Sequence, residues 1–367
     1  MREIRGVNLG NWLVLEKWMD REMFRGSIAE DETFLCQGLE EKEKRTRYIK
    51  HRKGWITKED FEQIAAVGFN LVRIPVPYFL FDSFGKFIPC IDTLDQAFDW
   101  AEEVGLQILL DLHTVPGGHN GTDNSGLCGV CTWSTKEQYR EITLEVLEKT
   151  AQRYGSRKAL WGIEPINEPM CSDTPAGTYM NIQQLSQYYR PADPEMAKDN
   201  TNYPLSYLKD FYRDAYRRMR QHLSEEKAVV FSDAFDVGNW KDFFQEREFK
   251  NIVLDTHQYL QMVEYGFGDE RPMEKYLDYL DGLRQQLAAV AADIPLLVGE
   301  WSLGNLMNGY ETKQRNAVMQ KLCEAYRAAI ETGIGWCFWS YKLAVEEPEK
   351  DLWDVRKCLD NGWLSLQ

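Results

Sequence analysis

Short, almost wholly apolar runs alternate along the chain with longer segments in which apolar residues recur at helical spacing. Eight apolar runs are predicted to be strands, and they cover residues 5–13, 70–76, 106–113, 160–168, 228–233, 252–259, 295–301 and 333–341. Helices are predicted between most of them, at residues 57–68, 93–105, 135–154, 205–224, 273–291 and 312–331. The first two begin at a threonine and end at a glycine, which are typical start and stop signals. Strands that are apolar on both faces belong to parallel sheets covered by helices, so the pattern predicts an α/β fold.

Eight such units, with no glycine-rich dinucleotide-binding motif after the first strand, favour a closed (β/α)8 TIM barrel over an open doubly wound sheet. We expect a single catalytic domain over residues 1–367, because no linker, internal repeat or low-complexity segment interrupts the pattern. Two connections, residues 13–56 and 170–203, are too long to be simple turns. The first holds the charge run EEKEKRTRYIKHRK, which is predicted to be a solvated helix face. The second should be a long loop at the C-terminal face of the barrel that borders the functional site.

Polar or aromatic side chains stand at the C-terminal end of almost every predicted strand. They are Asn8, Arg73, His113, Asn167, Glu168, His257, Tyr259, Glu300 and Trp339. In a (β/α)8 barrel these ends converge on one face, where the active sites of this fold lie. Ordinary packing or pairing could explain any one of them, but a core needs no ring of titratable groups at one end of its strands. We therefore expect this ring to form the active site.

The net charge narrows the class of ligand. The 58 acidic and 43 basic residues give a formal charge of −15, which disfavours nucleic acid and anionic membranes as partners and favours a neutral substrate. The chain shows no signal peptide and no run of about 20 apolar residues, so a cytoplasmic location is expected, or a secreted one where a leader has been removed. Most of the eight cysteines are predicted to be free, buried thiols. Cys128 and Cys131 form a C-x-x-C pair without a second pair at zinc-finger spacing, so neither a metal nor a cofactor is predicted.

Two carboxylates of the ring, Glu168 on the fourth strand and Glu300 on the seventh, suit hydrolysis of a glycosidic bond. That reaction needs one group to protonate the departing oxygen and another to attack the anomeric carbon. We predict that Glu300 is the nucleophile, because Arg73 and Tyr259 could donate hydrogen bonds that keep it ionised. Glu168 is then the acid and later the base, held protonated at a semi-buried strand end. Retention of configuration predicts a separation of about 5 to 5.5 Å between the two carboxyl groups.

Five motifs follow one another at barrel spacing: VRIP, DLH, NEP, GEW and FWSYK, on the second, third, fourth, seventh and eighth strands. Together they resemble glycoside hydrolase family 5, a clan A family of retaining (β/α)8 barrels, over nearly the whole chain. The segments GVNLGNWLVLEKWM and DLHTVPGGHNGTDNSG are similar to the branch that contains exo-β-1,3-glucanases and β-glucosidases. The resemblance implies that Glu168 is the acid/base, that Glu300 is the nucleophile and that Asn167 donates to the sugar 2-hydroxyl.

The resemblance also implies the roles of the other ring residues, which are Arg73 and Tyr259 beside the nucleophile, His113 and His257 around the sugar, and Trp339 as the platform beneath the ring. An aromatic face matches the apolar face of a β-glucose ring. Glu16, within LVLEKW, occupies the position of an acid that grips the hydroxyls of a terminal glucose in the exo-acting branch.

The sequence departs from that branch at two positions. Fungal exo-β-1,3-glucanases hold the next sugar in an aromatic clamp, whose positions are Thr122 and Met262 here. A preference for β-1,3-glucan polymer is therefore not expected. The segment 170–203 could rebuild the aglycone side with tyrosines, which are Tyr179, Tyr188 and Tyr189.

The leading hypothesis is a retaining exo-acting β-glucosidase or exo-β-glucanase (glycoside hydrolase, EC 3.2.1.-). It would remove terminal β-linked glucose from oligosaccharides or glucosides by double displacement, without a cofactor. An endo-acting, cellulase-like β-glucanase of the same family is the alternative among enzymes, and a cleft closed by Glu16 argues against it. A non-catalytic carbohydrate-binding barrel is the alternative from another class. The presence of both Glu168 and Glu300 argues against that, because pure binding needs neither an acid nor a nucleophile.

Overall fold

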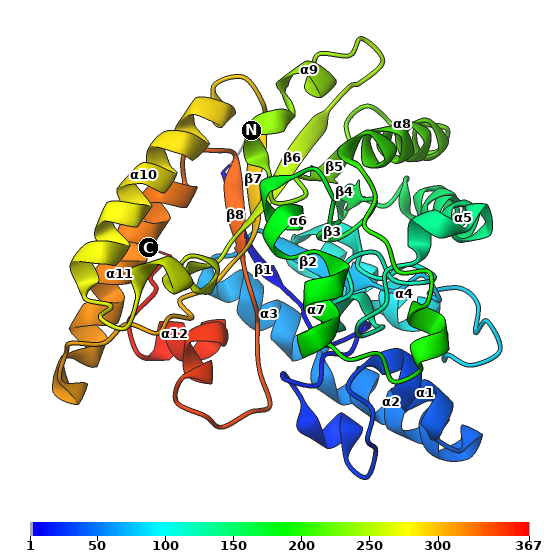
Figure 1. Ribbon diagram of the computed structural model, residues 1–367, viewed down its shortest axis with the longest axis horizontal. Coiled ribbons are helices and arrows are strands. Elements are labelled where there is room, and N and C mark those ends of the chain that lie inside the picture. Colours follow the sequence, from blue (N-terminus) through cyan, green and yellow to red (C-terminus); the bar gives the residue numbers. More distant parts are fainter. Residues whose placement is uncertain (1–2, 367) are drawn as a thin grey trace.

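The computed structural model describes residues 3–366 and contains a closed barrel of eight parallel strands in sequence order (Figure 1). The strands are β1 (Ile4–Asn8), β2 (Leu71–Val76), β3 (Gln107–Leu112), β4 (Leu160–Glu164), β5 (Ala228–Ser232), β6 (Ile252–Gln258), β7 (Leu296–Trp301) and β8 (Gly335–Phe338). The predicted (β/α)8 barrel and all eight predicted strands are confirmed.

The boundaries of several strands differ from the prediction, and the largest differences are at the ends of β1 and β4. β4 ends at Glu164 and not at residue 168, because Pro165 has no N–H to give to the strand ladder. Asn167 then donates its backbone N–H to the carbonyl oxygen of Leu112 at 3.1 Å, and Glu168 turns the chain with a φ of 44°. Both residues therefore lie on a turn just beyond the strand. β1, which was predicted to reach residue 13, ends at Asn8.

Helices surround the barrel on its outer side (Figure 1). The long ones are α3 (Lys58–Val67), α4 (Ile91–Val104), α5 (Glu137–Tyr154), α8 (Leu205–Arg220), α10 (Met273–Ala291) and α11 (Arg315–Ile330), and α9 (Lys241–Phe244) and α12 (Val355–Asp360) are short. α3 begins as predicted, since Thr57 and Asp60 exchange side-chain and backbone hydrogen bonds, and it ends at Gly68 with a φ of 114°. The predicted start of α4 at residue 93 is wrong. The carbonyl oxygen of Cys90 accepts from the backbone N–H groups of Thr93 and Leu94 at 3.1 Å, so the helix begins at Ile91.

The segment 13–56 packs against the mouth of the barrel and contains α1 (Glu32–Gly38) and α2 (Glu41–Trp55). The predicted charged helix exists as α2 and most of it is solvated, but one side is buried through Lys44, Tyr48, His51, Arg52 and Trp55. Arg52 donates to the carbonyl oxygens of Ile88 and Pro89 at 2.7 and 2.8 Å, and Trp55 Nε1 donates to the carbonyl oxygen of Gly10 at 2.9 Å. These bonds fix the chain that runs from β1 to Glu16.

The segment 170–203 is more ordered than the predicted loop and contains α6 (Pro175–Tyr179) and α7 (Ile182–Tyr188). It packs on the connection that follows β3. The side chain of Asn200 accepts from the backbone N–H of Cys131 and donates to the carbonyl oxygen of Gly129, both at 2.8 Å. Tyr203 donates its hydroxyl to the carbonyl oxygen of His119 at 3.2 Å. Two connections, after β3 and after β4, therefore form one layer over the same part of the barrel.

The inside of the barrel changes from apolar to charged along the strands. Near the strand starts it is filled by buried residues that include Leu71, Leu109 and Val253. Two residues further on, and so pointing the same way, come Arg73 on β2, Asp111 on β3 and Asp255 on β6. The charged layer thus forms the floor beneath the predicted active site.

Gly299 on β7 leaves room for this charged layer. A Cβ atom there would lie 1.9 Å from Oδ2 of Asp255, whose Oδ1 accepts from the backbone N–H of Gly299 at 2.5 Å. Elsewhere in the fold, all eight cysteines are free and buried, as predicted for most of them. None of the helices described here has both the length and the apolar character needed to cross a membrane.

Candidate active site

Arg73, which is fully buried on β2, links the residues that the sequence placed at the strand ends. Its Nη1 donates to Oε1 of Glu300 at 2.6 Å and to Oδ1 of Asn8 at 3.1 Å. Its Nη2 donates to Oδ1 of Asn167 at 2.8 Å. The amide nitrogen of Asn167 consequently lies on the side of His113, 3.4 Å from Nε2 of that ring. One guanidinium therefore fixes side chains that come from β1, β7 and the turn after β4.

Three buried acids that the sequence analysis did not select form the other side of this guanidinium. Glu164 accepts from Nε of Arg73 at 3.0 Å and from Nη2 at 2.9 Å. Asp111 lies 3.2 Å from Nη2, and Asp255 lies 3.9 Å from Nε. A signal for two of them was present, because Asp111 and Asp255 stand two residues before His113 and His257 and so share their face of the strand.

Glu300, at the end of β7, is held by one donor on each oxygen. Arg73 binds Oε1, and the hydroxyl of Tyr259 donates to Oε2 at 2.7 Å. Both predicted donors are thus in place. Burial nevertheless raises the pKa of Glu300 above its usual value, and the charge of Glu168 adds to that rise, while the positive charges of His257 and Arg73 oppose it. The carboxylate of Glu300 is buried, and its two donors hold it in one orientation.

Glu168 occupies a constrained turn that the connection after β3 supports. A φ of 44° is uncommon for a residue with a side chain, and such conformations cluster at functional sites. Asn120 donates to the carbonyl oxygen of Glu168 at 3.2 Å, and His119 Nε2 is hydrogen-bonded to the carbonyl oxygen of Asn167. Burial lowers the pKa of His119 to about 4, so this ring is neutral and donates. The backbone around the acid is therefore held in place by side chains from another loop.

The carboxylate of Glu168 is bound on both oxygens. Oε1 pairs with Nδ1 of His257 at 2.8 Å, and Oε2 accepts from Nδ2 of Asn124 at 2.6 Å. Burial alone would raise the pKa of Glu168, but the hydrogen bond and the charge of His257 outweigh it and lower this pKa to about 2. The sequence predicted a protonated Glu168, and the structure differs because it sets an imidazolium beside the carboxylate.

His257 carries the proton that was expected on Glu168. Burial works to lower its pKa, but the charge of Glu300, the hydrogen bond with Glu168 and the carboxylate of Asp255, 3.6 Å from Nε2, raise this pKa well above its usual value. A nitrogen of His257 and one oxygen each of Glu168 and Glu300 all lie within 4.8 Å of one another. This spacing fits the separation of about 5 to 5.5 Å in retaining glycosidases and is too short for the roughly 6.5 to 9.5 Å of inverting ones.

Glu16 lies within the electrostatic reach of Glu168 and Glu300. It is buried, its Oε2 accepts from Nε1 of Trp18 at 2.8 Å, and its backbone N–H donates to Oδ1 of Asn11 at 2.9 Å. Burial and then the charge of Asp123 raise the pKa of Glu16 well above its usual value, and the charges of Glu300 and Glu168 contribute as well. Burial likewise raises the pKa of Asp123 to about 6. Glu16 and Asp123 therefore lie close together.

Asp123 and Asn124 are the functional residues that the sequence analysis missed, although both lie in the quoted motif NGTDNSG. Thr122, which stands where the exo-β-1,3-glucanases have a residue of the aromatic clamp, belongs to the same motif. Its hydroxyl donates to Oδ1 of Asn124 at 2.6 Å, which turns the amide nitrogen of Asn124 toward Glu168. The residue at the clamp position therefore orients an amide of the site.

The ring of Trp339, which follows β8, is stacked on the ring of His113, which follows β3. Their ring centroids are 5.7 Å apart and the rings are nearly parallel, at 7°. Asp111 Oδ2 binds Nδ1 of His113 at 2.5 Å and so fixes its orientation. Of the tyrosines in the segment 170–203, Tyr179 and Tyr188 are 78% and 85% exposed.

Tyr189 is the tyrosine of that segment that lies near the site. It is partly buried, and the burial of its hydroxyl raises the pKa, with smaller contributions from the charges of Asp123, Cys128, Glu16 and Glu168. Its hydroxyl therefore lies within the electrostatic reach of carboxylates of the site.

Two groups of described residues have the spacing of a metal site, and they share His257: Glu164 with Asp255, and Glu168 with Glu300. Arg73 already binds Glu164 and Glu300 with its guanidinium. A divalent cation would meet electrostatic repulsion from this fixed charge. The donor set therefore fits a cleft for a neutral substrate better than a metal centre.

The sequence matches the cellulase family (glycosyl hydrolase family 5) over residues 30–344. It is 31% identical to the probable glucan 1,3-beta-glucosidase A of Aspergillus terreus, over 98% of this chain and 87% of that protein. It is 26% identical to glucan 1,3-beta-glucosidase 2 of Candida albicans, over 98% of this chain and 83% of that protein.

Solved structures share the fold. The rutinosidase from Aspergillus niger matches with a TM-score of 0.77 and 23% identity, over 99% of this chain and 98% of that chain. Thermotoga maritima Cel5A in complex with cellobiose matches with a TM-score of 0.55 and 14% identity, over 98% of this chain and 96% of that chain. From its sequence match and its barrel, the chain belongs to glycoside hydrolase family 5, whose members are retaining (β/α)8-barrel glycosidases of clan A.

Proposed function

We propose that the protein is an exo-acting β-glucosidase or exo-β-glucanase that removes terminal β-linked glucose from oligosaccharides or glucosides. Membership of a retaining family and the short distance between Glu168 and Glu300 support a double displacement. The names of the relatives, glucan 1,3-beta-glucosidases, support glucose as the sugar that is released.

In the first step Glu300 attacks the anomeric carbon and forms a bond to it through one carboxylate oxygen. The bond to the leaving oxygen breaks, and that oxygen takes a proton from Glu168. In the resting site this proton is on His257, whose Nδ1 is 2.8 Å from Oε1 of Glu168, so it can pass to the acid along an existing hydrogen bond. The proton therefore need not come from solvent.

In the second step a water molecule attacks the anomeric carbon and displaces Glu300. Glu168, now ionised, takes the proton from that water and passes it back to Nδ1 of His257, which returns the site to its initial state. Arg73 and Tyr259 stabilise the carboxylate that leaves, because both already donate to its oxygens at 2.6 and 2.7 Å. Because Arg73 binds the amide oxygen of Asn167, the amide nitrogen lies on the opposite side, next to His113, where it would donate to the sugar 2-hydroxyl.

The observation that carries exo action is the buried acidic end wall at Glu16. A long glucan chain can pass through an open cleft, but a wall at the glycone side admits only a chain end. Glu16 and Asp123 are also suited to bind hydroxyl groups of a terminal glucose, because a carboxylate is a strong acceptor and a protonated carboxyl group also donates. Their raised pKa values are consistent with this mixed role.

Short substrates fit the aglycone side better than a polymer. The hydroxyl of Thr122 is hydrogen-bonded to Asn124. Met262 is 42% exposed, and neither residue offers an aromatic face to a second sugar. Tyr189 is the aromatic residue placed to contact the aglycone. We therefore propose that linkage is selected weakly and that simple β-glucosides are good substrates.

A product profile tests this proposal. The purified protein is given β-1,3-, β-1,4- and β-1,6-linked glucose oligomers, an aryl β-glucoside and a rutinoside, and products are followed over time. Glucose as the sole early product, with β-configuration by NMR, supports the proposal. Early release of di- or trisaccharides from the oligomers would point to endo action, and release of rutinose to a diglycosidase. No turnover with retained binding would support a carbohydrate-binding barrel.

A further inference from the structure

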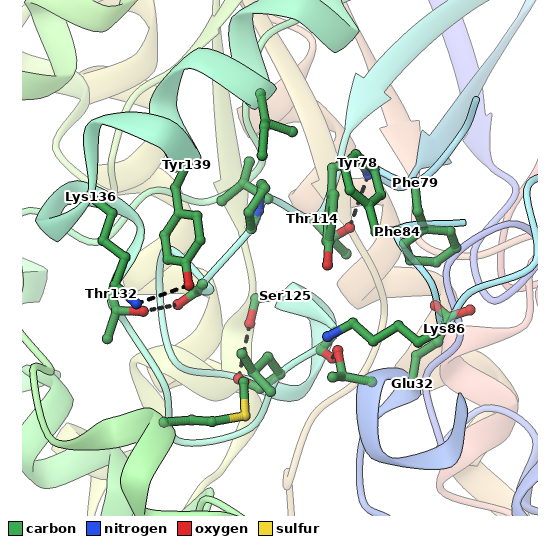
Figure 2. Close-up of a pocket in the computed structure, with 18 of the residues that line it drawn as sticks. Glu32, Tyr78, Phe79, Phe84, Lys86, Thr114, Ser125, Thr132, Lys136 and Tyr139 are labelled. Carbon is green, nitrogen blue, oxygen red and sulfur yellow. Dashed lines mark hydrogen bonds between the residues drawn. The ribbon is translucent and has the colours of Figure 1, made fainter. Parts of the chain in front are cut away.

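A second cavity lies beside the catalytic site and shares none of its residues. It has a volume of about 440 Å³, within the range of small-molecule sites, and none of the nine predicted site residues lines it. Its walls come from the connections that follow β2, β3 and β4 and from the start of α5. Figure 2 shows Tyr139 and Lys136 on one side, Tyr78 and Phe84 on the other, and Ser125 between them.

The cavity presents aromatic surface that the core does not require. Phe84 is 39% exposed and has a φ of 46°, which is unfavourable for a bulky residue. Its ring packs against Tyr78, with 5.3 Å between the centroids. Backbone strain that places an apolar ring at a surface is expected where the ring has a function. Tyr139, on the opposite side, is only partly buried.

The charges around the cavity balance. Three lysines line the cavity together with three acids, so basic and acidic residues are equal in number: Lys86, Lys136, Lys198, Glu32, Glu195 and Asp199. Such a site has no preference for an anion or a cation, and it offers charged donors and acceptors to a neutral ligand. Hydroxyl groups of Thr114, Ser125 and Thr132 line it as well. Aromatic faces combined with many hydrogen-bonding groups and no net charge fit a saccharide.

Lys86 is the group most directly available to such a ligand. Figure 2 shows its ammonium group extending toward the middle of the cavity. It is partly buried, and burial lowers its pKa. Among residues 3–366, no carboxylate lies within 4.0 Å of its Nζ, which instead sits 5.0 Å above the ring of Phe87. A partly desolvated ammonium without a close counter-ion gains free energy from a ligand hydroxyl or ring oxygen.

The wall between the two sites is a single stretch of chain. Thr114 and Ser125, which line the cavity, directly follow His113 and Asn124, which belong to the catalytic site. Thr114 Oγ1 also accepts from the backbone N–H of Tyr78 at 3.3 Å. We propose that this cavity is a second saccharide-binding site, which takes a glucose unit of a short β-glucan on the far side of the wall from the catalytic glutamates. The choice of sugar rests on the proposed function.

The test measures sugar binding while the catalytic site is blocked. The protein is labelled with 2,4-dinitrophenyl 2-deoxy-2-fluoro-β-glucoside, which should remain bound to Glu300, and mass spectrometry checks that labelling is complete. Binding of laminaritriose and cellotriose is then measured by calorimetry and by saturation-transfer NMR. We expect one further site with a Kd of about 1 mM, a value in the usual range of weak ligand binding.

Two variants and one control identify the site. Phe84→Gly removes the ring and suits the positive φ, so it should fold at least as well as the parent protein. Lys86→Met removes the ammonium group and keeps the stem. Each should weaken binding about 10-fold, which is the loss expected for one good contact. Tyr265→Ala removes another tyrosine, 92% exposed and outside this cavity, and should leave binding unchanged.

The outcomes separate the two proposals. If the labelled parent protein binds neither trisaccharide, or if both variants bind as tightly as the parent, the second site is refuted. Binding of inorganic phosphate in place of sugar, with the same dependence on Lys86, would refute it as well. Failure of the fluoroglucoside to label Glu300 would overturn the proposed retaining glucosidase alone, because the effect of Phe84→Gly on sugar binding can still be measured.

Discussion

The hydrogen bond from Tyr259 to Glu300 allows a quantitative prediction. The hydroxyl donates to Oε2 at 2.7 Å, whereas the other oxygen is held by Arg73. Tyr259→Phe deletes this donor and leaves the ring and the Arg73 bond in place. A hydrogen bond to a charged group contributes roughly 1.5–3 kcal/mol, and 1.36 kcal/mol corresponds to one pH unit. Because the lost bond favours the ionised form, protonation of Glu300 should become easier by about one to two pH units.

The pH dependence of kcat/KM is the appropriate assay, because it reports ionisations of the free enzyme. A 2,4-dinitrophenyl β-glucoside is the best substrate, since its leaving group needs no proton and the acidic limb then reflects Glu300. We expect this limb to move to higher pH in Tyr259→Phe, so that activity on the acidic side falls about 10- to 100-fold, while the plateau changes less.

Tyr326→Phe is the matched control for this experiment. Tyr326 is also buried, and its hydroxyl donates to the backbone carbonyl of Gln258, next to Tyr259, without touching a carboxylate. It should change the melting temperature but not the acidic limb. An acidic limb that stays in place in Tyr259→Phe would show that this hydroxyl does not govern the ionisation of Glu300, and the reasoning above would be wrong.

Three further substitutions test the assigned roles. Glu300→Ala should abolish turnover of an aryl β-glucoside, and added azide should restore it with an α-glucosyl azide as product; near-normal activity without azide would remove the nucleophile assignment. Glu16→Ala should lower kcat/KM for terminal-glucose substrates about 10- to 100-fold, the effect of losing a charge-assisted hydrogen bond, and an unchanged value would count against exo action. His257→Gln should move the basic limb of the pH profile for an alkyl glucoside to lower pH. The raised pKa of His257 keeps the catalytic proton on the pair of His257 and Glu168 until the pH exceeds that pKa. A basic limb that does not move would show that His257 does not hold this proton.

The sequence predicts the barrel and the ring of residues because both depend on local periodicity. Strand positions follow from runs of apolar residues, and the residues at strand ends follow from the rule that parallel strands of a barrel end on one face. Arg73, His257 and Glu300 were found in this way. The errors occur at boundaries, where a single residue changes the hydrogen bonding, as Pro165 does at the end of β4.

The loops and the protonation states could not be derived in the same way. Asn124 donates to Glu168 while Thr122 and Asn120 donate to its amide oxygen, and no periodicity encodes the fold of such a loop. His257 and Glu168 are 89 residues apart in the sequence and 2.8 Å apart in space. Glu164 was left without a role because its partner, Arg73, comes from a strand two positions away around the barrel.

The chemical difference between the two cations of the site supports the roles of the two glutamates. A guanidinium stays protonated at any relevant pH, so Arg73 can only keep Glu300 ionised and cannot supply it with a proton. An imidazole exchanges its proton near neutral pH, and Nδ1 of His257 is closer to Glu168, at 2.8 Å, than to Glu300, at 3.5 Å.

The low pKa of Glu168 is then compatible with its role as the acid. The pair of Glu168 and His257 holds one proton between them, and that proton moves to the carboxylate when a leaving oxygen demands it. Glu300 has no hydrogen bond to His257, and of its two donors the tyrosine keeps its proton because burial and the nearby glutamate charges raise the pKa of Tyr259 far above neutral. A carboxylate beside a permanent cation is suited to attack, and a carboxylate beside a titratable one is suited to deliver and recover a proton. This difference, more than the resting pKa of either acid, supports the proposed roles of Glu300 as the nucleophile and Glu168 as the acid/base.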